Sequence, residues 1–129
     1  MIDRPPRVLF VEDDIGKRYV IARQLREAGF EIVEATTGAE ALATLTPEFD
    51  IAILDMKLPD MYGWNVCRKI KEDPRLKDIP VIFLTAKGGG DALAEGFESG
   101  AVMYINKPFT ANKLLTIVNT MLESGSNLS

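Results

Sequence analysis

The sequence predicts an α/β fold in which helices cover both faces of a parallel, doubly wound five-stranded sheet. Short apolar runs, rich in β-branched residues, alternate five times with segments whose apolar residues recur at spacings of three and four. The uninterrupted apolar runs are typical of strands that are buried on both faces, as in parallel sheets. The regular alternation predicts right-handed crossovers, each containing one helix.

Composition is consistent with one domain and limits its possible functions. The chain has 129 residues, 47% hydrophobic and 26% charged, which indicates a globular domain rather than a disordered chain. Its net charge of −4 argues against bulk attraction to nucleic acid. The lack of histidine and the single cysteine, Cys67, exclude a Ser-His-Asp triad, a histidine metal site and an internal disulfide. No apolar run approaches the ~20 residues that span a bilayer, so we expect a soluble cytoplasmic protein.

Strands and helices alternate along the whole chain. The predicted strands are Arg7–Val11, Glu31–Ala35, Ile51–Leu54, Val81–Leu84 and Val102–Ile105. The segments of helical spacing that follow them are 15–28, Gly38–Leu45, 64–72, Asp91–Ser99 and 110–122. Residues that commonly end helices follow three of these segments. Gly29 suits the position after the first helix, and Pro47 and Pro74 stop the second and third helices.

Two segments fall outside this alternation. The run Gly88–Gly90 is a mobile hinge by composition, or only a loose loop. The small polar residues Ser124–Ser129 predict a frayed end. We therefore expect one domain over residues 1–124 and a flexible tail over residues 125–129.

Polar side chains follow four of the predicted strands. Glu12 and Asp13 follow the first strand, Asp55 the third, Thr85 the fourth and Lys107 the fifth. Alone, Asp55 would also fit an aspartate that starts a loop and accepts from a nearby amide. Ligands of such sheets bind outside the carboxyl ends of the strands. In the strand order 2-1-3-4-5 the three acids would converge there, with Thr85 and Lys107 beyond Asp55.

This constellation fits phosphoryl chemistry. Three carboxylates in one cleft repel each other and need a cation, and ligation by oxygen alone suits Mg²⁺. With the metal bound, Asp55 could attack phosphorus and form an aspartyl-phosphate. The metal, the Thr85 hydroxyl with nearby amides, and the Lys107 ammonium could each take one phosphoryl oxygen.

From Val8 to about Leu122 the sequence resembles the receiver domain of two-component response regulators, such as the chemotaxis regulator. The matching motifs are Val11-Glu12-Asp13, Leu54-Asp55-Met56-Lys57-Leu58-Pro59-Asp60-Met61-Tyr62-Gly63, Leu84-Thr85-Ala86 and Lys107-Pro108-Phe109. Any one of these motifs alone is a weak signal. Together, in order and at strand ends, they are highly specific.

The resemblance implies a flavodoxin-like fold with strand order 2-1-3-4-5 and a set of site residues. Asp55 would be the phosphoacceptor. The metal, Mg²⁺ or Mn²⁺, would be held by Glu12, Asp13, Asp55 and the backbone carbonyl of Lys57. The phosphoryl group would be bound by Thr85, Ala86 and Lys107, with Tyr104 as an aromatic switch on the fifth strand.

The resemblance also implies partners. A sensor histidine kinase or a phosphotransfer protein would supply the phosphoryl group. An output protein or a second copy of the chain would bind the face made by the fourth helix, the fifth strand and the fifth helix. We expect no binding of nucleic acid or membrane by this domain. We expect no enzyme activity beyond Mg²⁺-dependent self-phosphorylation and autodephosphorylation at Asp55.

The sequence departs from the common family pattern in three places. Val102-Met103 stand where acidic residues are frequent, and they would make the binding face less charged unless they are core residues. Lys57 and Lys87 each lie two residues beyond a site residue, where their ammonium groups could flank the phosphoryl pocket. They leave the lifetime of the phosphorylated state open.

Several residues near the motifs have simpler interpretations. We interpret Asp14 as a helix-start residue rather than a ligand, and Asp60 as turn chemistry beside a proline. Trp64 and Cys67 fit packing roles. Tyr104 fits a half-buried strand aromatic as well as a switch.

Three other classes of protein share part of this pattern. A haloacid-dehalogenase-type phosphatase needs a second aspartate two residues after the first, where this chain has Lys57. A flavodoxin-like electron carrier needs a loop rich in hydroxyl groups and glycine after the first strand, where this chain has three acids. A non-phosphorylated pseudo-receiver, acting only as a protein-interaction module, would have lost an acid, the threonine or the lysine. A phosphorylatable receiver is therefore the first hypothesis.

Overall fold

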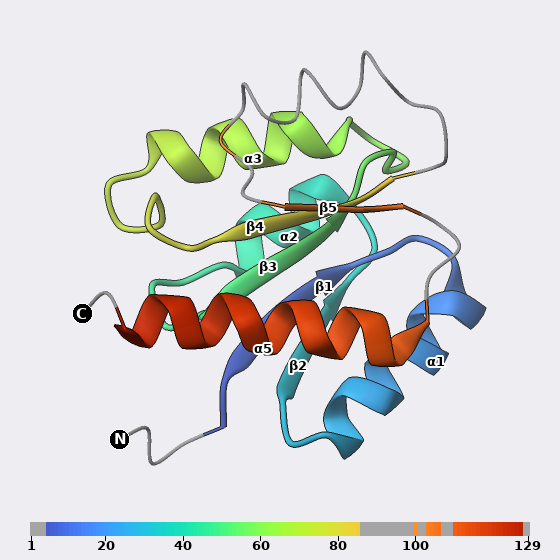
Figure 1. Ribbon diagram of the computed structural model, residues 1–129. Helices are drawn as coiled ribbons and strands as arrows, with labels where there is room; N and C mark the ends of the chain where they lie inside the picture. Colours follow the sequence, from blue (N-terminus) through green and yellow to red (C-terminus); the bar gives the residue numbers. More distant parts are fainter. Residues whose placement is uncertain (1–4, 86–99, 101–102, 107–109, 128–129) are drawn as a thin grey trace.

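Five strands pair in parallel in one sheet, in the order β2-β1-β3-β4-β5 that the sequence predicts (Figure 1). The computed structural model describes residues 5–85, 100, 103–106 and 110–127. The strands are β1 (Arg7–Val11), β2 (Glu31–Ala35), β3 (Ile51–Asp55), β4 (Val81–Thr85) and β5 (Met103–Asn106). The predicted fold class is confirmed.

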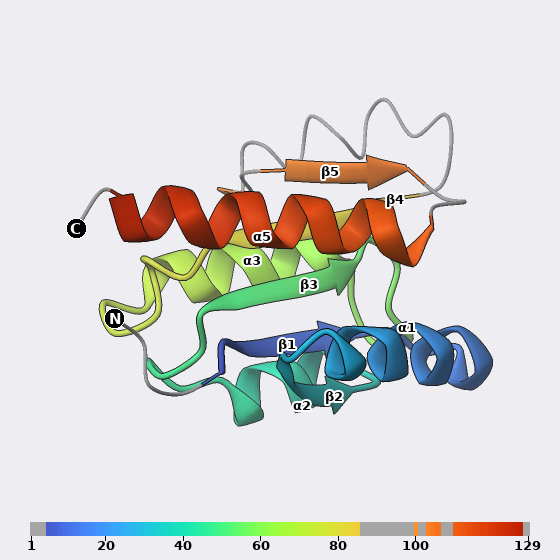
Figure 2. The same ribbon diagram turned by 60° about the horizontal axis from the view of Figure 1, so that its bottom comes forward.

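Helices cover both faces of this sheet. The described helices are α1 (Ile15–Glu27), α2 (Gly38–Thr44), α3 (Gly63–Glu72) and α5 (Ala111–Asn127). Helices α1 and α5 lie on one face, and α2 and α3 lie on the other (Figures 1 and 2). The sheet is thus the middle of three layers.

The core consists of two apolar layers, one on each face of the sheet. Along β3, Ile51 and Ile53 pack into the layer under α1 and α5, whereas Ala52 and Leu54 pack into the layer under α2 and α3. All four side chains are buried, which explains why the run is apolar without alternation. Cys67 is buried in the second layer as an unbridged thiol, so its packing role is confirmed.

Most predicted boundaries agree with the structure. Asp14 is the N-cap of α1, and its Oδ1 accepts the main-chain N–H of Lys17 at 2.9 Å, which confirms its helix-start role. After α1, Gly29 has φ of +102°, a conformation that glycine adopts without strain. Helix α3 ends at Glu72, directly before Asp73 and its proline, as predicted.

The differences at element ends have a common cause. β3 and β4 each include one more residue than predicted, Asp55 and Thr85, and β5 runs to Asn106. These polar residues still pair with the neighbouring strand, although the apolar pattern has ended. Helix α5 likewise continues from Leu122 to Asn127 through polar residues that carry no apolar signal.

Some expectations fall outside the described residues. The predicted fourth helix, Asp91–Ser99, and the run Gly88–Gly90 lie there, as does Val102. The division into a domain over residues 1–124 and a flexible tail stays a prediction. In the described part of the chain, no helix has both the length and the apolar character needed to cross a membrane.

Gly63 should be difficult to replace, because α3 begins close to the end of β3. A Cβ at Gly63 would lie 2.5 Å from the main-chain oxygen of Asp55 and 2.8 Å from Cε1 of Phe83. We expect Gly63→Ala to lower the free energy of unfolding by about 1–3 kcal/mol through overpacking.

Gly16→Ala in α1 is the matched control, because its Cβ would meet only Asp14 Oδ1, at 3.5 Å. There we expect unchanged stability or a gain of up to about 1 kcal/mol from helix propensity. Urea unfolding of both variants measures the difference. Equal stability of the two variants would contradict the close approach at Gly63.

Candidate functional site

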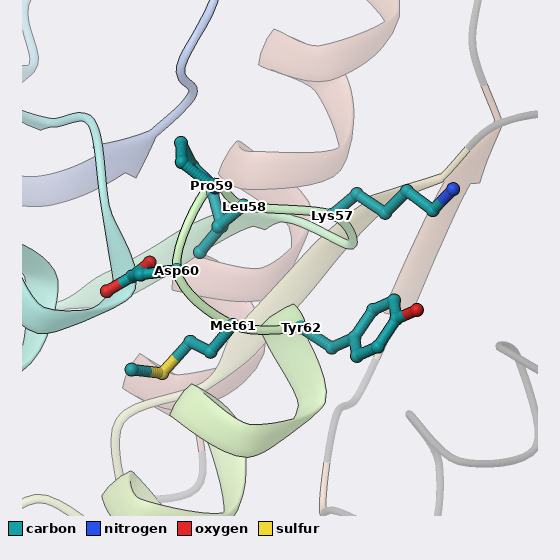
Figure 3. Close-up of a pocket in the computed structure, with 6 residues that line it drawn as sticks. All are labelled: Lys57, Leu58, Pro59, Asp60, Met61 and Tyr62. Carbon is teal, nitrogen blue, oxygen red and sulfur yellow. The ribbon is translucent and has the colours of Figure 1, made fainter.

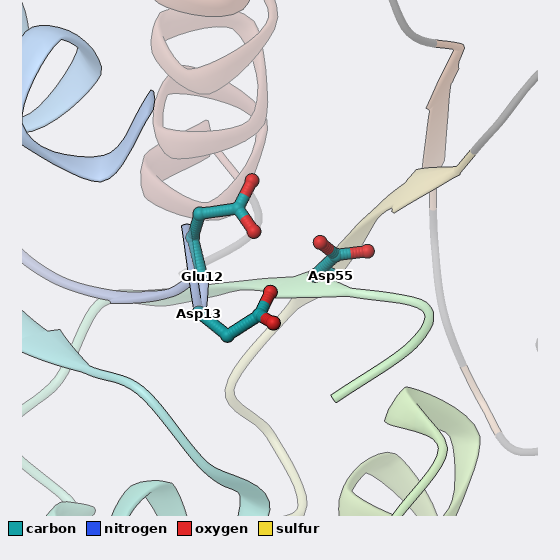
Figure 4. A group of neighbouring side chains, drawn as sticks. All are labelled: Glu12, Asp13 and Asp55. Carbon is teal, nitrogen blue, oxygen red and sulfur yellow. The ribbon is translucent and has the colours of Figure 1, made fainter. Parts of the chain in front are cut away.

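The structure brings Glu12, Asp13 and Asp55 together at the carboxyl ends of two adjacent strands. Val11 pairs with Leu54, so the residue after β1 is level with the last residue of β3. One carboxylate oxygen from each of the three residues lies within 4.8 Å of the other two. Figure 4 shows the Glu12 and Asp13 side chains extending from the end of β1 toward Asp55.

Burial raises the free-energy cost of keeping these carboxylates charged. Glu12 is 3% exposed and Asp55 is 8% exposed, and they are the buried charged residues among those described. A buried carboxylate is costly unless it is paired, and a second carboxylate nearby raises the cost. Asp13 is exposed, so the cluster opens to solvent on its side. A cation bound by all three carboxylates would offset their repulsion.

The donor set fits a hard divalent cation. All three side chains offer carboxylate oxygens, which suit Mg²⁺, Ca²⁺ or Mn²⁺ better than softer metals. The main-chain N–H of Lys57 donates to Asp55 Oδ1 at 3.3 Å, so the chain turns back over the acid directly after it. The Lys57 side chain itself is exposed to solvent.

The loop between β3 and α3 is tied to the sheet through its main chain. The N–H of Met56 donates to the Leu84 carbonyl at 2.9 Å, and the N–H of Gly63 donates to the Met56 carbonyl at 2.7 Å. Within the loop, the N–H of Leu58 donates to the Met61 carbonyl at 3.1 Å. These bonds fix the segment that carries the Lys57 carbonyl.

Asp60 has a role that its turn context does not reveal. Its two carboxylate oxygens accept the main-chain N–H groups of Gly38 at 2.8 Å and Ala39 at 2.9 Å, at the start of α2. These two bonds lower the pKa of Asp60, the bond from Ala39 most strongly. Bonds within its own turn, from the N–H groups of Asp60 and Met61, also lower it. The interpretation of Asp60 as turn chemistry alone was therefore incomplete.

An open hollow of about 330 Å³ lies on this loop and is lined by Lys57, Leu58, Pro59, Asp60, Met61 and Tyr62. Lys57 and Tyr62 extend to one side of the loop, and Asp60 and Met61 extend to the other (Figure 3). The Tyr62 ring stacks on Trp64 with centroids 4.2 Å apart. Trp64 also packs against the core, as predicted.

The other predicted site residues are described in part or not at all. The main chain of Thr85 pairs with Asn106, and that of Tyr104 pairs with Phe83. Thr85 therefore lies at the end of β4, next to β3, and Tyr104 lies on β5, one strand farther from β3. Their side chains are not described. Ala86, Lys87 and Lys107 lie outside the described residues. The roles predicted for these five residues stay predictions.

The comparison with protein families gives a direct result. Residues 8–119 match the model of the response regulator receiver domain. The chain belongs to this family. The match extends from the second residue of β1 into α5, so it includes all of β2 to β5 and all of β1 except Arg7.

Relatives and solved structures agree with that assignment. The receiver domain is 38% identical over 120 residues to the DNA-binding dual master transcriptional regulator RpaA of Synechocystis, covering 91% of this chain and 49% of the relative. A response regulator structure from Chloroflexus aurantiacus has 35% identity and a TM-score of 0.84, covering 93% of this chain and 99% of the other. A CheY-like receiver domain structure from Methanospirillum hungatei has 28% identity and a TM-score of 0.90, covering 97% and 99%.

The chain spans about half the length of the curated relatives that it matches. The similarity to the two solved structures, in contrast, extends over nearly their full length.

The cap by Asp60 predicts a pH-dependent contribution to stability. A carboxylate whose pKa is lowered on folding stabilises the fold fully above its ordinary pKa, which is about 3.8 for an aspartate. This contribution is lost as the pH falls through the lowered folded value, because the unfolded state binds the proton first. We expect Asp60→Asn to be less stable than wild type at pH 7, by a margin that narrows on acidification toward pH 3.

Urea unfolding of both proteins at several pH values measures this margin. Other acids titrate in both proteins, so the difference between them isolates residue 60. A margin that does not change between pH 7 and pH 3 would show that the carboxylate does not cap α2.

Proposed function

We propose that this receiver domain accepts a phosphoryl group on Asp55 in the presence of Mg²⁺, as one step of a two-component phosphorelay in the cytoplasm. The observation that carries the proposal is the convergence of the Glu12, Asp13 and Asp55 carboxylates within 4.8 Å. Asp55 is the member on the central strand, and its side chain starts from the carboxyl end of the parallel sheet.

In the proposed reaction, a carboxylate oxygen of Asp55 attacks phosphorus. A bond forms between that oxygen and phosphorus, and the bond from phosphorus to the donor's leaving group breaks, with both electrons of that bond leaving on the donor. Mg²⁺ held by Glu12, Asp13, Asp55 and the Lys57 carbonyl would offset charge on the phosphoryl oxygens. Thr85, Ala86 and Lys107 are proposed to bind the remaining oxygens, with Lys57 and Lys87 as flanking cations.

The donor is proposed to be a sensor histidine kinase or a phosphotransfer protein. The output is proposed to be a protein, or a second copy of this chain, that binds the face of the predicted fourth helix, β5 and α5. No enzyme activity beyond self-phosphorylation and autodephosphorylation is proposed. A pseudo-receiver that only binds proteins is the alternative, and the presence of all three acids, Thr85 and Lys107 in the sequence disfavours it.

Labelling by a small phosphodonor tests the proposal. We expect acetyl phosphate with Mg²⁺ to add one phosphoryl group, which intact-protein mass spectrometry detects and which chelation of the metal prevents. Asp55→Asn should abolish the added mass, because an amide oxygen is a poor nucleophile. Asp78→Asn, which removes an exposed carboxylate from the loop before β4, is the control and should label like wild type. Undiminished labelling of Asp55→Asn would exclude Asp55 as the acceptor.

A second experiment tests the proposed output face. We expect beryllofluoride, a phosphoryl mimic, to shift the amide NMR signals of β5 and α5 as well as those next to Asp55. Two packings of the Tyr104 ring would provide the bistable element. The signals of β2, at the far edge of the sheet, are the internal control. Shifts confined to the neighbourhood of Asp55 would count against signalling through this face.

A further inference from the structure

Arg18, in the first turn of α1, contacts the main chain of Glu12. Glu12 is a member of the acid cluster that it forms with Asp13 and Asp55. Arg18 Nη1 donates to the main-chain carbonyl of Glu12 at 2.8 Å. Its Nε donates to Glu34 Oε1 on β2 at 3.1 Å. The Arg18 side chain is 15% exposed, so these bonds form in a partly desolvated place, where they are stronger than on an open surface.

These contacts close the loop between β1 and α1. The main-chain N–H of Arg18 donates to the Asp14 carbonyl at 2.9 Å, and its guanidinium returns to the Glu12 carbonyl. At the start of the loop, the N–H of Glu12 donates to the Ala35 carbonyl at 3.1 Å. One arginine therefore spans the three acidic residues that follow β1.

The planarity of the peptide bond links this carbonyl to the carboxylates. The Glu12 carbonyl belongs to the peptide unit that joins Glu12 to Asp13, and that unit also contains the Cα atoms of both residues. A bond that fixes the direction of the carbonyl therefore fixes the plane from which both acidic side chains project. Figure 4 shows these two side chains extending from adjacent positions toward Asp55.

We propose that Arg18 is a positioning residue for the metal site: it orients the Glu12–Asp13 peptide so that both carboxylates are pre-arranged for the cation. This inference rests on the proposed function, because it assumes that the cluster binds Mg²⁺. Groups that orient metal ligands without touching the metal commonly change metal affinity by 10- to 100-fold.

The positive charge of Arg18 and its bond to the Glu12 carbonyl would change Mg²⁺ affinity in opposite directions. A positive charge close to the cluster opposes cation binding, so removal of the charge alone would tighten Mg²⁺ binding. Removal of the positioning bond would weaken it. The direction of the change in affinity therefore separates positioning from simple electrostatics.

Arg26 offers a matched control on the same helix. Its Nη2 pairs with the other oxygen of Glu34, Oε2, at 3.0 Å and donates to the Ile32 carbonyl at 2.9 Å. Arg26→Met removes the same charge and the same ion-pair partner as Arg18→Met. It leaves the Glu12 carbonyl bond in place.

The test is calorimetric titration of the whole chain with Mg²⁺, for wild type, Arg18→Met, Arg18→Lys and Arg26→Met. We expect Arg18→Met to weaken binding about 10-fold. Arg18→Lys keeps the charge but loses the two-pronged contact and should also bind more weakly than wild type. Arg26→Met should bind within about twofold of wild type. In the absence of metal, the Asp13 amide NMR signal should shift in Arg18→Met and not in Arg26→Met.

Each other outcome has a definite meaning. Binding by folded Arg18→Met or Arg18→Lys that is as tight as in wild type, or tighter, would overturn the positioning role. Should Arg18→Met fail to fold, Arg18→Lys decides the question alone, because weaker binding is expected there too. Equal weakening in Arg26→Met would assign the effect to Glu34 and overturn the role of the carbonyl bond. If wild type itself does not bind Mg²⁺, both this inference and the proposed metal site are wrong.

Discussion

The parallel pairing of β1 with β3 is the constraint on which the candidate site depends. It sets Glu12 level with Asp55, and it brings like charges into one cluster that would separate in a flexible chain. The two apolar layers oppose that separation. A slip of β1 by one residue would turn its buried side chains to the opposite faces of the sheet, which both cores resist. Burial of the central strands thus maintains an electrostatically unfavourable arrangement at their ends.

The loops that complete the site are held by contacts to their main chains. The loop after β3 is bonded to α2 through Asp60 and to the end of β3 through Gly63, whose lack of a side chain permits the close approach. The loop after β1 is closed by Arg18. Because Asp60, which caps α2, and Lys57, whose N–H donates to Asp55, belong to one short segment, a shift of α2 would be transmitted to the chain next to Asp55.

The order of the elements and the three converging acids could be predicted from the sequence, because both depend on local pattern. Apolar runs mark the strands, and the acids follow them directly. The contacts of Asp60 and Arg18 could not be predicted in this way. Asp60 bonds to residues 21 and 22 positions away, and Arg18 pairs with a glutamate 16 positions away. Nothing in the sequence distinguishes Arg18 from the other basic residues of α1, since the decisive feature is the direction of a guanidinium in the folded chain.

The placement of positive charge beside the cluster also has a physical logic. A guanidinium bonded to the carboxylates of a metal site would neutralise them and compete with a cation. Arg18 instead meets the main-chain carbonyl of Glu12, and its charge is offset by Glu34, a carboxylate outside the cluster. Arg26 pairs with the other oxygen of the same glutamate, so two arginines of α1 form ion pairs with Glu34 on β2. Arg18 therefore fixes the backbone of these acids through a strong, charge-assisted bond to a carbonyl, while its own ion pair is with Glu34.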